Sequence, residues 1–410
     1  MSTHPQQDQR PEAADVAGAA RSTTPPGRRQ IVDGSTGFVG ANLIHRLLAN
    51  GNHVTALARQ PPDAVRHQIT TAAIADTDLA SPQLGTTSIA TTGSELVSQA
   101  APANLPGLEV LDWSLDRPDL GLAQAALEEL FAEPCDYWHL AAAITFRPGN
   151  HEELQQVNVD GTRTALAVFH KYAPAGSRFF QVSSAYSCGV VSDEVPEVWH
   201  PSAEPHEFRN YYEYTKREAE LLYADTPGAV LRLGQIVGDS RTGRAATDYG
   251  LYDYIRAIHT ITRRRPHESL RVVGDPTAEL HLVPVDACVR WMTELANRDL
   301  SRLDQPIIHL VDSVSVTAAK VAEMISAHLP VDLRIAPQDE VAAAPLNQLE
   351  RVLEARMTYT GKYISRSIKF RRDNLPALGI DDPPTVSDDV LDRLVGSYAR
   401  SLQTPNGAPR

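Results

Sequence analysis

The chain has 410 residues, of which 42% are hydrophobic and 22% charged, and its formal net charge at pH 7 is −13. This acidic balance excludes the clustered basic face that nucleic-acid binding needs. No apolar run approaches the roughly 18 residues of a membrane-spanning helix, and residues 1–29 lack the apolar stretch of a signal peptide, so we expect a cytoplasmic protein. Three widely spaced cysteines, Cys135, Cys188 and Cys288, form neither a disulfide framework nor a metal pattern, and no metal site is expected.

Short apolar runs and helical patterns alternate along most of the chain. Residues 1–29 are rich in Ala, Pro, Gln and Thr and predict a disordered tail, because little apolar surface is available to offset the entropy of ordering. After the tail, strands are expected at 30–33, 53–58, 108–112, 136–140, 178–182 and 229–233, and helices at 38–50, 122–131, 152–172 and 211–224. This repeated β-α-β order predicts an α/β fold, a doubly wound parallel sheet with helices on both faces.

Two segments depart from this alternation. Residues 60–107 are rich in Ala, Thr, Ser, Pro and Gln, and we expect a mobile insertion with one helix near 63–73. Beyond residue 243 the helical patterns lengthen, which predicts that 244–410 forms a smaller, mainly helical substrate-binding cap with strands that return to the sheet. Residues 390–402 carry apolar side chains at helical spacing and predict one buried stripe, packed on the cap or at a homodimer interface.

Three glycines, Gly34, Gly37 and Gly40, lie at three-residue intervals between the first expected strand and the first expected helix. In such a turn the first glycine permits unusual dihedral angles, the second lets the backbone approach a pyrophosphate, and the third allows the helix to pack closely. The N–H groups and the positive end of the helix then bind phosphate. Residues 30–243 are therefore expected to form a Rossmann-type dinucleotide-binding domain.

The end of the second strand distinguishes the two dinucleotides. An acidic residue there would bind the ribose 2′-hydroxyl of NAD, whereas an arginine pairs with the 2′-phosphate of NADP. The strand at 53–58 is followed by Arg59 and has no carboxylate, so NADP is favoured, although a solvated arginine at a strand end gives the same pattern. Asp112, which closes the third strand, is placed to contact adenine or to cap a loop.

The segment 210–216, NYYEYTK, places Tyr212 and Lys216 four residues apart, on one face of a helix. A phenol with a reference pKa of about 10 is a poor acid–base group at neutral pH, and a neighbouring ammonium lowers that pKa. Ser183 and Ser184 follow the fifth strand, at the edge of the sheet where ligands bind. We expect Ser184 to hydrogen-bond a substrate carbonyl oxygen while Tyr212 supplies a proton, and Ser183 to cap the strand end.

Together with the motifs HLAAA (139–143) and NVDGT (158–162), these features resemble the extended short-chain dehydrogenase/reductase superfamily over residues 30–300. Three further motifs narrow the resemblance to the thioester reductase-like branch, which includes carrier-dependent reductase domains and fatty acyl-CoA reductases of the male-sterility type. They are LDRPDLGL at 115–122, LRLGQIVGDSRTG at 231–243 and LVPVDACV at 282–289.

The resemblance implies NADPH as the cofactor and Ser184, Tyr212 and Lys216 as the catalytic residues. It implies hydride transfer to the carbonyl of an acyl thioester, carried by a protein or by coenzyme A, or to a derived aldehyde or ketone. Residues of the glycine turn, the strand ends and the catalytic helix are expected to hold the cofactor. They are Gly34, Ser35, Thr36, Gly37, Phe38, Val39, Gly40, Arg59, Asp112, Trp113, Leu140, Ala141, Ala142, Asn158, Val182, Tyr212, Lys216, Leu233, Gly234 and Ile236.

Some positions depart from the family pattern or take other roles. Asp33 stands where the family usually has threonine, and a carboxylate so near a pyrophosphate is unfavourable unless it points away. Ser184 replaces the more usual threonine and keeps the hydroxyl. His139 is expected to be structural or to line the cofactor, and Asn158 to hydrogen-bond backbone between helix and sheet.

Two other functions remain open on the sequence alone. Nucleotide-sugar epimerases and dehydratases share the fold and the triad but usually retain bound NAD, and dehydratases carry acidic residues where this chain has Ala185 and Tyr186. A non-catalytic dinucleotide-binding scaffold would keep the fold without turnover. Substrate contacts are expected from 145–150, 187–208 and the cap after residue 243.

Overall fold

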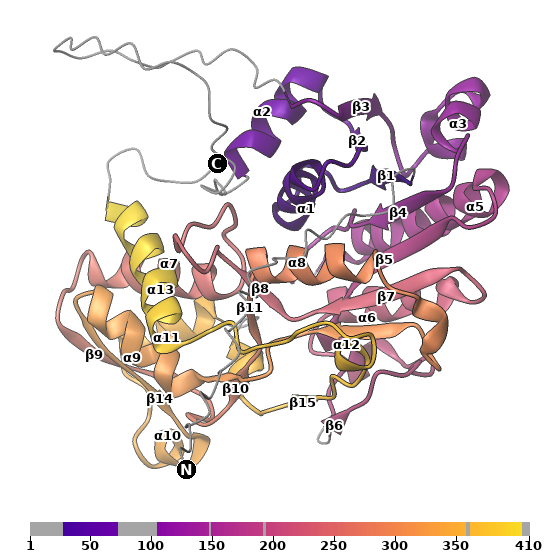
Figure 1. The fold of residues 1–410 in the computed structure, drawn as a ribbon. Helices are drawn as coiled ribbons and strands as arrows, with labels where there is room; N and C mark the ends of the chain where they lie inside the picture. Colours follow the sequence, from indigo (N-terminus) through magenta and orange to yellow (C-terminus); the bar gives the residue numbers. More distant parts are fainter. Residues whose placement is uncertain (1–27, 73–104, 147–148, 192–193, 358–360, 404–410) are drawn as a thin grey trace, which may run out of the picture.

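The structure, a computed structural model, describes residues 28–72, 105–146, 149–191, 194–357 and 361–403. Its centre is a seven-stranded parallel sheet with the strand order β12-β7-β5-β4-β1-β2-β3 (Figure 1). The strands are β1 (Arg29–Val32), β2 (Val54–Ala58), β3 (Leu108–Asp112), β4 (Cys135–His139), β5 (Arg178–Ser184), β7 (Gly228–Leu233) and β12 (Ile307–Leu310). The expected doubly wound parallel sheet is confirmed.

Six of these strands lie within two residues of the expected positions, and β12 has no counterpart among them. The helices of this half also follow the expectation, except that the helix expected at 152–172 is interrupted by a π-helical turn. They are α1 (Phe38–Ala49), α2 (Pro62–Ala72), α3 (Gln124–Leu130), α4 (His151–Leu154), the turn η3 (Gln155–Asp160), α5 (Gly161–Tyr172), α6 (Tyr211–Glu220) and η6 (Leu221–Tyr223).

Neighbouring residues of each central strand belong to different hydrophobic cores, because side chains alternate across a sheet. Trp138 and Phe180 pack in the core that includes α1, α2 and the later helix α8 (Val285–Leu295). Tyr137 and Phe179, one position earlier on the same strands, pack in the core that includes α3 and α5. Helices therefore cover both faces of the sheet.

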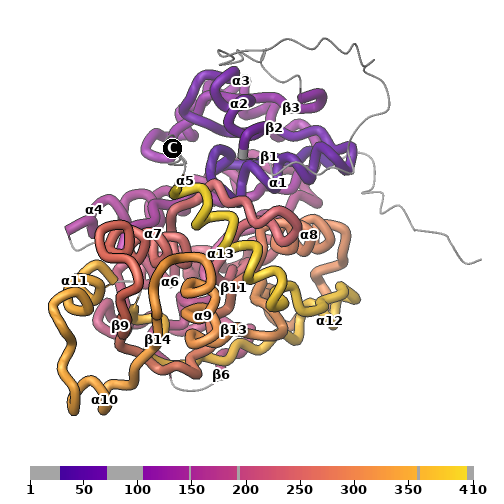
Figure 2. Tube along the Cα trace, turned by 90° about the vertical axis from the view of Figure 1, so that its left-hand side faces the viewer, coloured from indigo at the N-terminus to yellow at the C-terminus, as the bar shows by residue number. Residues whose placement is uncertain are grey.

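The cap has a core of its own. It is built from α7 (Leu251–Thr262), α9 (Ala318–His328), α11 (Gln348–Arg356) and α13 (Asp388–Gln403), together with the parallel pair β9 (Glu268–Val273) and β14 (Val331–Ala336). Figure 2 shows α13, in yellow, lying across the cap beside α7 and α9. The buried stripe expected at 390–402 is confirmed, since α13 turns Leu391, Leu394 and Tyr398 into this core.

The remaining elements are short. They are η2 (Pro118–Gly121), η4 (Ala185–Cys188), β6 (Glu194–Val195), η5 (Pro205–Glu207), β8 (Gln235–Val237), β10 (Glu279–Leu280), β11 (Leu282–Pro284), η7 (Leu300–Arg302), β13 (Val316–Thr317), α10 (Gln338–Ala343), η8 (Gly361–Ile364), β15 (Lys369–Phe370) and α12 (Asn374–Ala377). The expected disordered tail lies outside the described residues up to residue 27, and so do residues 73–104 of the expected insertion.

Three global properties follow from the described residues. None of their helices is both long enough and apolar enough to cross a bilayer. All three cysteines are buried and unpaired. Within the same ranges, no three side chains of the metal-ligating types come together.

Candidate active site

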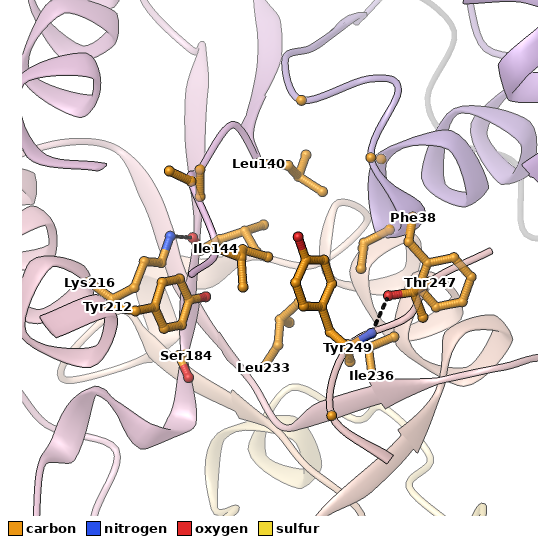
Figure 3. A pocket seen from close by; sticks show the side chains of 18 of the residues that line it. Phe38, Leu140, Ile144, Ser184, Tyr212, Lys216, Leu233, Ile236, Thr247 and Tyr249 are labelled. Carbon is orange, nitrogen blue, oxygen red and sulfur yellow. Dashed lines mark hydrogen bonds between the residues drawn. The ribbon is translucent and has the colours of Figure 1, made fainter. Parts of the chain in front are cut away.

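A cavity of about 980 Å³ lies at the carboxyl ends of β1, β4, β5 and β7 and extends under the cap (Figure 3). This volume is at the upper end of the range of about 300–1,000 Å³ that is typical of small-molecule sites. It opens between β1 and β4, whose connections leave in opposite directions, and this is where open parallel sheets bind ligands. Its cap side is largely apolar. The residues there are Leu251, Tyr254, Leu280, Leu282, Ala318, Val321, Ile335 and Ile364.

The glycine turn after β1 forms the floor of the sheet side. Gly34 has φ +58°, and a Cβ there would lie 2.7 Å from the backbone nitrogen of Ala141. A Cβ at Gly40 would lie 2.3 Å from the carbonyl oxygen of Gly34. Gly37, the N-cap of α1, offers no side-chain acceptor to the first N–H groups of the helix, so these donors remain available to a phosphate.

Asp33 points away from this turn. Its carboxylate is fully buried and accepts hydrogen bonds from the backbone N–H groups of Leu140 and Ala141, each at 2.7 Å. The phenol of Tyr137 also donates to it, and its other close partner is the imidazole of His139. The condition set by the sequence, that this carboxylate must turn away from a pyrophosphate, is therefore met. The same contacts tie the loop after β1 to the loop after β4.

The three expected catalytic residues lie in one cavity wall. Tyr212 and Lys216 project from α6, and Ser184 ends β5 (Figure 3). The ammonium of Lys216 donates to the carbonyl oxygen of Val182 at 2.7 Å, which fixes the lysine between α6 and β5. Asn210 starts the helix, since its side-chain oxygen accepts from the backbone N–H of Glu213 at 3.0 Å.

The two serines after β5 take different roles from one another. Ser184 Oγ accepts from the backbone N–H of Tyr186 at 3.2 Å and so caps the η4 turn, while its side chain lines the cavity. Ser183 does not cap the strand end as expected. Its hydroxyl donates to the buried carboxylate of Glu220 at 2.5 Å, because the next residue already supplies the cap.

The family follows from a comparison of the sequence. The family model described as male sterility protein matches residues 32–292. The chain belongs to the male sterility protein family. The resemblance to the thioester reductase-like branch is thereby confirmed.

Two curated proteins are also similar in sequence to this member of the male sterility protein family. The polyketide synthase-nonribosomal peptide synthetase ACE1 of Pyricularia oryzae is 28% identical over 210 residues, which make up 50% of this chain and 4% of ACE1. Sterol demethylase protein B of Methylococcus capsulatus is 26% identical over 301 residues, 67% of this chain and 77% of that protein. The chain therefore spans a small part of the first relative.

Solved structures of similar fold include reductase domains and epimerases. The terminal R domain from the myxalamid PKS-NRPS pathway has a TM-score of 0.68 at 21% identity, covering 94% of both chains. A thiolation-reductase di-domain from an archaeal non-ribosomal peptide synthetase has a TM-score of 0.65 at 14% identity, covering 92% of this chain and 77% of that one. UDP-glucuronic acid 4-epimerase from Bacillus cereus, in complex with NAD, has a TM-score of 0.58 at 15% identity, covering 92% and 100%.

All but two of the residues expected to hold the cofactor of this family member line the cavity. Asp112 is exposed and does not line it, although its neighbours Trp113 and Asp116 do, because the strand ends at Asp112 and the chain turns toward the cavity after it. The exposed Arg59 lines the rim, and no hydrogen-bond partner is found for its guanidinium in the described part of the chain.

Asn158 is the second exception. It is 1% exposed, exchanges hydrogen bonds with the backbone N–H and carbonyl of Ala143 at 2.8 and 3.1 Å, and donates to Thr215 on α6 at 3.0 Å. The π-helical turn η3, in which it lies, breaks the expected long helix. Asn158 thus joins the loop after β4 to α6. Its hydrogen bonds to the backbone of Ala143 agree with the expectation that it bonds backbone between helix and sheet. His139 is likewise buried behind the cavity wall, with Thr162 as its second partner.

Burial controls the ionisation of the catalytic pair. It lowers the pKa of Lys216 to about 8, against the opposing charges of Glu220 and Asp33. Burial also raises the pKa of Tyr212, and the neighbouring Glu213 carboxylate raises it further. These two causes, burial and Glu213, set the direction of the shift, and the expected lowering of this pKa by Lys216 is not found among them.

Several residues that line the cavity were not predicted from the sequence. Phe146, Tyr186, Tyr249 and Tyr363 bring aromatic rings to the cavity. Tyr249 is 56% exposed, lines the cavity and lies between Phe38 and Tyr212 in the view of Figure 3.

The expected substrate segments are only partly at the cavity. Phe146 from 145–150 and the cap line it, but none of the described residues of 187–208 does.

Proposed function

We propose that the protein is an NADPH-dependent reductase that acts on the carbonyl of an acyl thioester, bound to a carrier protein or to coenzyme A, or on a derived aldehyde or ketone. The observation that carries the proposal is that Ser184, Tyr212 and Lys216 share one cavity with an uncapped glycine turn and an apolar cap lining. The thiolation-reductase di-domain among the similar structures supports a carrier-bound substrate.

The chemistry of each residue follows from its position. NADPH, when bound, supplies a hydride to the carbonyl carbon. Tyr212 donates its proton to the carbonyl oxygen, and the hydroxyl of Ser184 donates a hydrogen bond to the same oxygen. The ammonium of Lys216 holds the cofactor and supports the phenolate left on Tyr212. With a thioester, the product of this addition is a hemithioacetal; its carbon–sulfur bond then breaks, the hydroxyl proton passes to the sulfur, which leaves as a thiol, and an aldehyde remains.

Arg59 supports NADP as the cofactor. A guanidinium binds a phosphate through paired, charge-assisted hydrogen bonds, and this one stands at the rim without a competing ion pair in the described ranges. A carboxylate lies near it. The hydrogen bond from Ser114 lowers the pKa of Asp116, and the charges of Arg117 and Arg59 contribute to this lowering. A phosphate bound by Arg59 would therefore be repelled by Asp116.

Arg59→Ala is expected to raise the KM for NADPH about tenfold and to leave the KM for NADH unchanged, since a hydrogen bond to a charged group at an exposed site contributes about 1.5 kcal/mol, the low end of the usual range. Asp116→Asn tests the opposite effect: it removes the charge that repels the phosphate and is expected to lower the KM for NADPH. Steady-state rates with both nucleotides measure the two effects. Equal changes for NADPH and NADH in Arg59→Ala would remove Arg59 from the recognition of the phosphate.

The pH dependence of the reaction reports on Lys216. Because its ammonium is the active form and its pKa is about 8, kcat/KM for NADPH is expected to fall as the pH rises through about 8. Lys216→Arg keeps its charge throughout this range, so its profile is expected to lose that step, at whatever lower rate the variant retains. A wild-type profile that stays flat through pH 8 would contradict the assignment.

The reaction class is tested with purified protein, NADPH and a series of acyl pantetheine thioesters and aldehydes of increasing chain length. We expect consumption of NADPH together with release of free thiol and formation of an aldehyde or alcohol. Extraction of tightly bound NAD from the purified protein, with no consumption of NADPH on any of these substrates, would instead favour the epimerase function.

A further inference from the structure

A tyrosine from the cap reaches the first turn of the catalytic helix. Tyr363 lies on η8, and its hydroxyl donates to Glu213 Oε1 at 2.6 Å and accepts from Asn210 Nδ2 at 2.9 Å. Asn210 is the N-cap of α6, and Glu213 directly follows Tyr212. The contact joins residues 150 positions apart.

The Glu213 carboxylate, which accepts the hydrogen bond from Tyr363, is completely buried. Its second oxygen accepts from the Arg209 guanidinium at 2.9 Å and from the Arg209 backbone N–H at 3.3 Å. Burial of a charge is strongly unfavourable unless the charge is paired and hydrogen-bonded. Arg209 and Tyr363 together provide those partners, so the orientation of Glu213 at the start of α6 depends on a group from the cap.

The same tyrosine contacts the residues around Ser184. Its ring lies edge-on to that of Tyr186, with 4.9 Å between centroids, and the Tyr186 backbone N–H donates to Ser184 Oγ. The Arg209 guanidinium lies over both rings, 5.4 and 5.5 Å from their centroids. The ring of Phe146 packs edge-on to that of Tyr212, with 5.7 Å between centroids, and its centroid lies 6.3 Å from that of Tyr363.

η8 is held firmly enough to serve as a support. The carbonyl oxygen of Ile364 accepts from the Asp275 backbone N–H at 2.8 Å, within the cap. On the other side, the ammonium of Lys362 donates to the Arg209 carbonyl oxygen at 2.8 Å. Tyr363 itself lines the cavity. The turn is thus fixed both to the cap and to the segment that starts α6.

We propose that Tyr363 is a positioning residue: through Glu213 and Tyr186 it aligns the hydroxyls of Tyr212 and Ser184 on one substrate oxygen. This inference rests on the proposed function, since it takes Tyr212 as the proton donor. In this proposal the cap helps to position the catalytic residues, in addition to binding the acyl chain.

The test compares Tyr363→Phe with Tyr223→Phe. Both remove a hydroxyl from a tyrosine that donates within the protein, and Tyr223 donates to the Phe179 carbonyl oxygen at 2.7 Å, in the core behind the sheet. Tyr363→Phe is expected to lower kcat about tenfold, because loss of one partner leaves a buried carboxylate undersatisfied. The NADPH dissociation constant and the KM for the thioester are expected to stay within about twofold of the wild type. Tyr223→Phe is expected to lower stability but not kcat.

Two further measurements separate alignment from general loosening. The solvent deuterium isotope effect on kcat is expected to rise in Tyr363→Phe, since donation of the proton by Tyr212 becomes slower, and to stay unchanged in Tyr223→Phe. In a double-mutant cycle, Tyr363→Phe is expected to add little to Glu213→Gln, because the hydroxyl acts through that carboxylate and phenylalanine keeps the ring that contacts Tyr186. Additive losses would overturn this route.

The two proposals fail in different ways. If the wild type reduces thioesters and Tyr212→Phe does not, but Tyr363→Phe matches Tyr223→Phe in kcat and isotope effect, the positioning role is overturned and the proposed function stands. If the wild type reduces none of the thioesters or aldehydes with NADPH, both are overturned.

Discussion

Tyr212→Phe is expected to lower kcat for thioester reduction by about 10²- to 10⁴-fold, the usual contribution of a positioned acid. The phenol lines the cavity on the same wall as Ser184 and Lys216, and the substitution removes its proton while keeping the ring. Binding of NADPH is expected to change little, since the ammonium of Lys216 remains anchored to Val182. Single-turnover oxidation of NADPH measures the chemical step directly.

Tyr214→Phe is the matched control for this substitution. Tyr214 lies two residues farther along the same helix and is not among the described residues that line the cavity. We expect its kcat to stay within about twofold of the wild type. Equal single-turnover rates for Tyr212→Phe and the wild type would remove Tyr212 from the mechanism.

Arg232→Met is expected to lower the free energy of unfolding by about 3–5 kcal/mol, the usual cost of leaving a buried charge without its partner. Arg232, fully buried on β7, pairs with Glu220 at 2.8 Å, and Glu220 is 1% exposed. Burial opposes ionisation of Glu220, but the charge and hydrogen bonds of Arg232 lower its pKa overall. Urea unfolding followed by circular dichroism measures the loss.

A surface pair provides the comparison for Arg232. Arg334 and Glu340 also form an ion pair, at 2.6 Å, but their side chains are 49% and 38% exposed. Arg334→Met is therefore expected to cost no more than about 1 kcal/mol. Similar losses for both arginine variants would show that the interior pair is not the stabilising element we take it to be.

The sheet was predictable from the sequence wherever its pattern is local. Each strand from β1 to β7 of the central sheet is a short apolar run flanked by turns and helical spacing, so its position could be inferred without knowledge of its partners. β12 offers no such context. It is four residues long, includes His309, and pairs with β7 across more than 70 residues of intervening chain. A short apolar run of this kind does not differ from a buried helical segment in any local property.

The site divides in the same way. The glycine turn and the Tyr212–Lys216 spacing are contained in single segments, and the chemistry they suggest can be read from the order of residues. The contact between Tyr363 and Glu213 is different, because the two residues are 150 positions apart and only folding brings them together. Asp33 is an intermediate case: the sequence marked it as unfavourable, and its backbone donors at Leu140 and Ala141 explain why it is tolerated.

The path of the chain between sheet and cap limits how the protein can be divided. After β7 the chain builds α7 and β9 of the cap, returns as α8 and β12, and leaves again to complete the cap with α9, β14, α11 and α13, while α12 packs beside β12. A truncation at residue 243 would therefore strip a border strand from the sheet and expose the backbone of β7, an open edge that invites aggregation. The two lobes should melt together, and neither should be obtainable as a separate fragment.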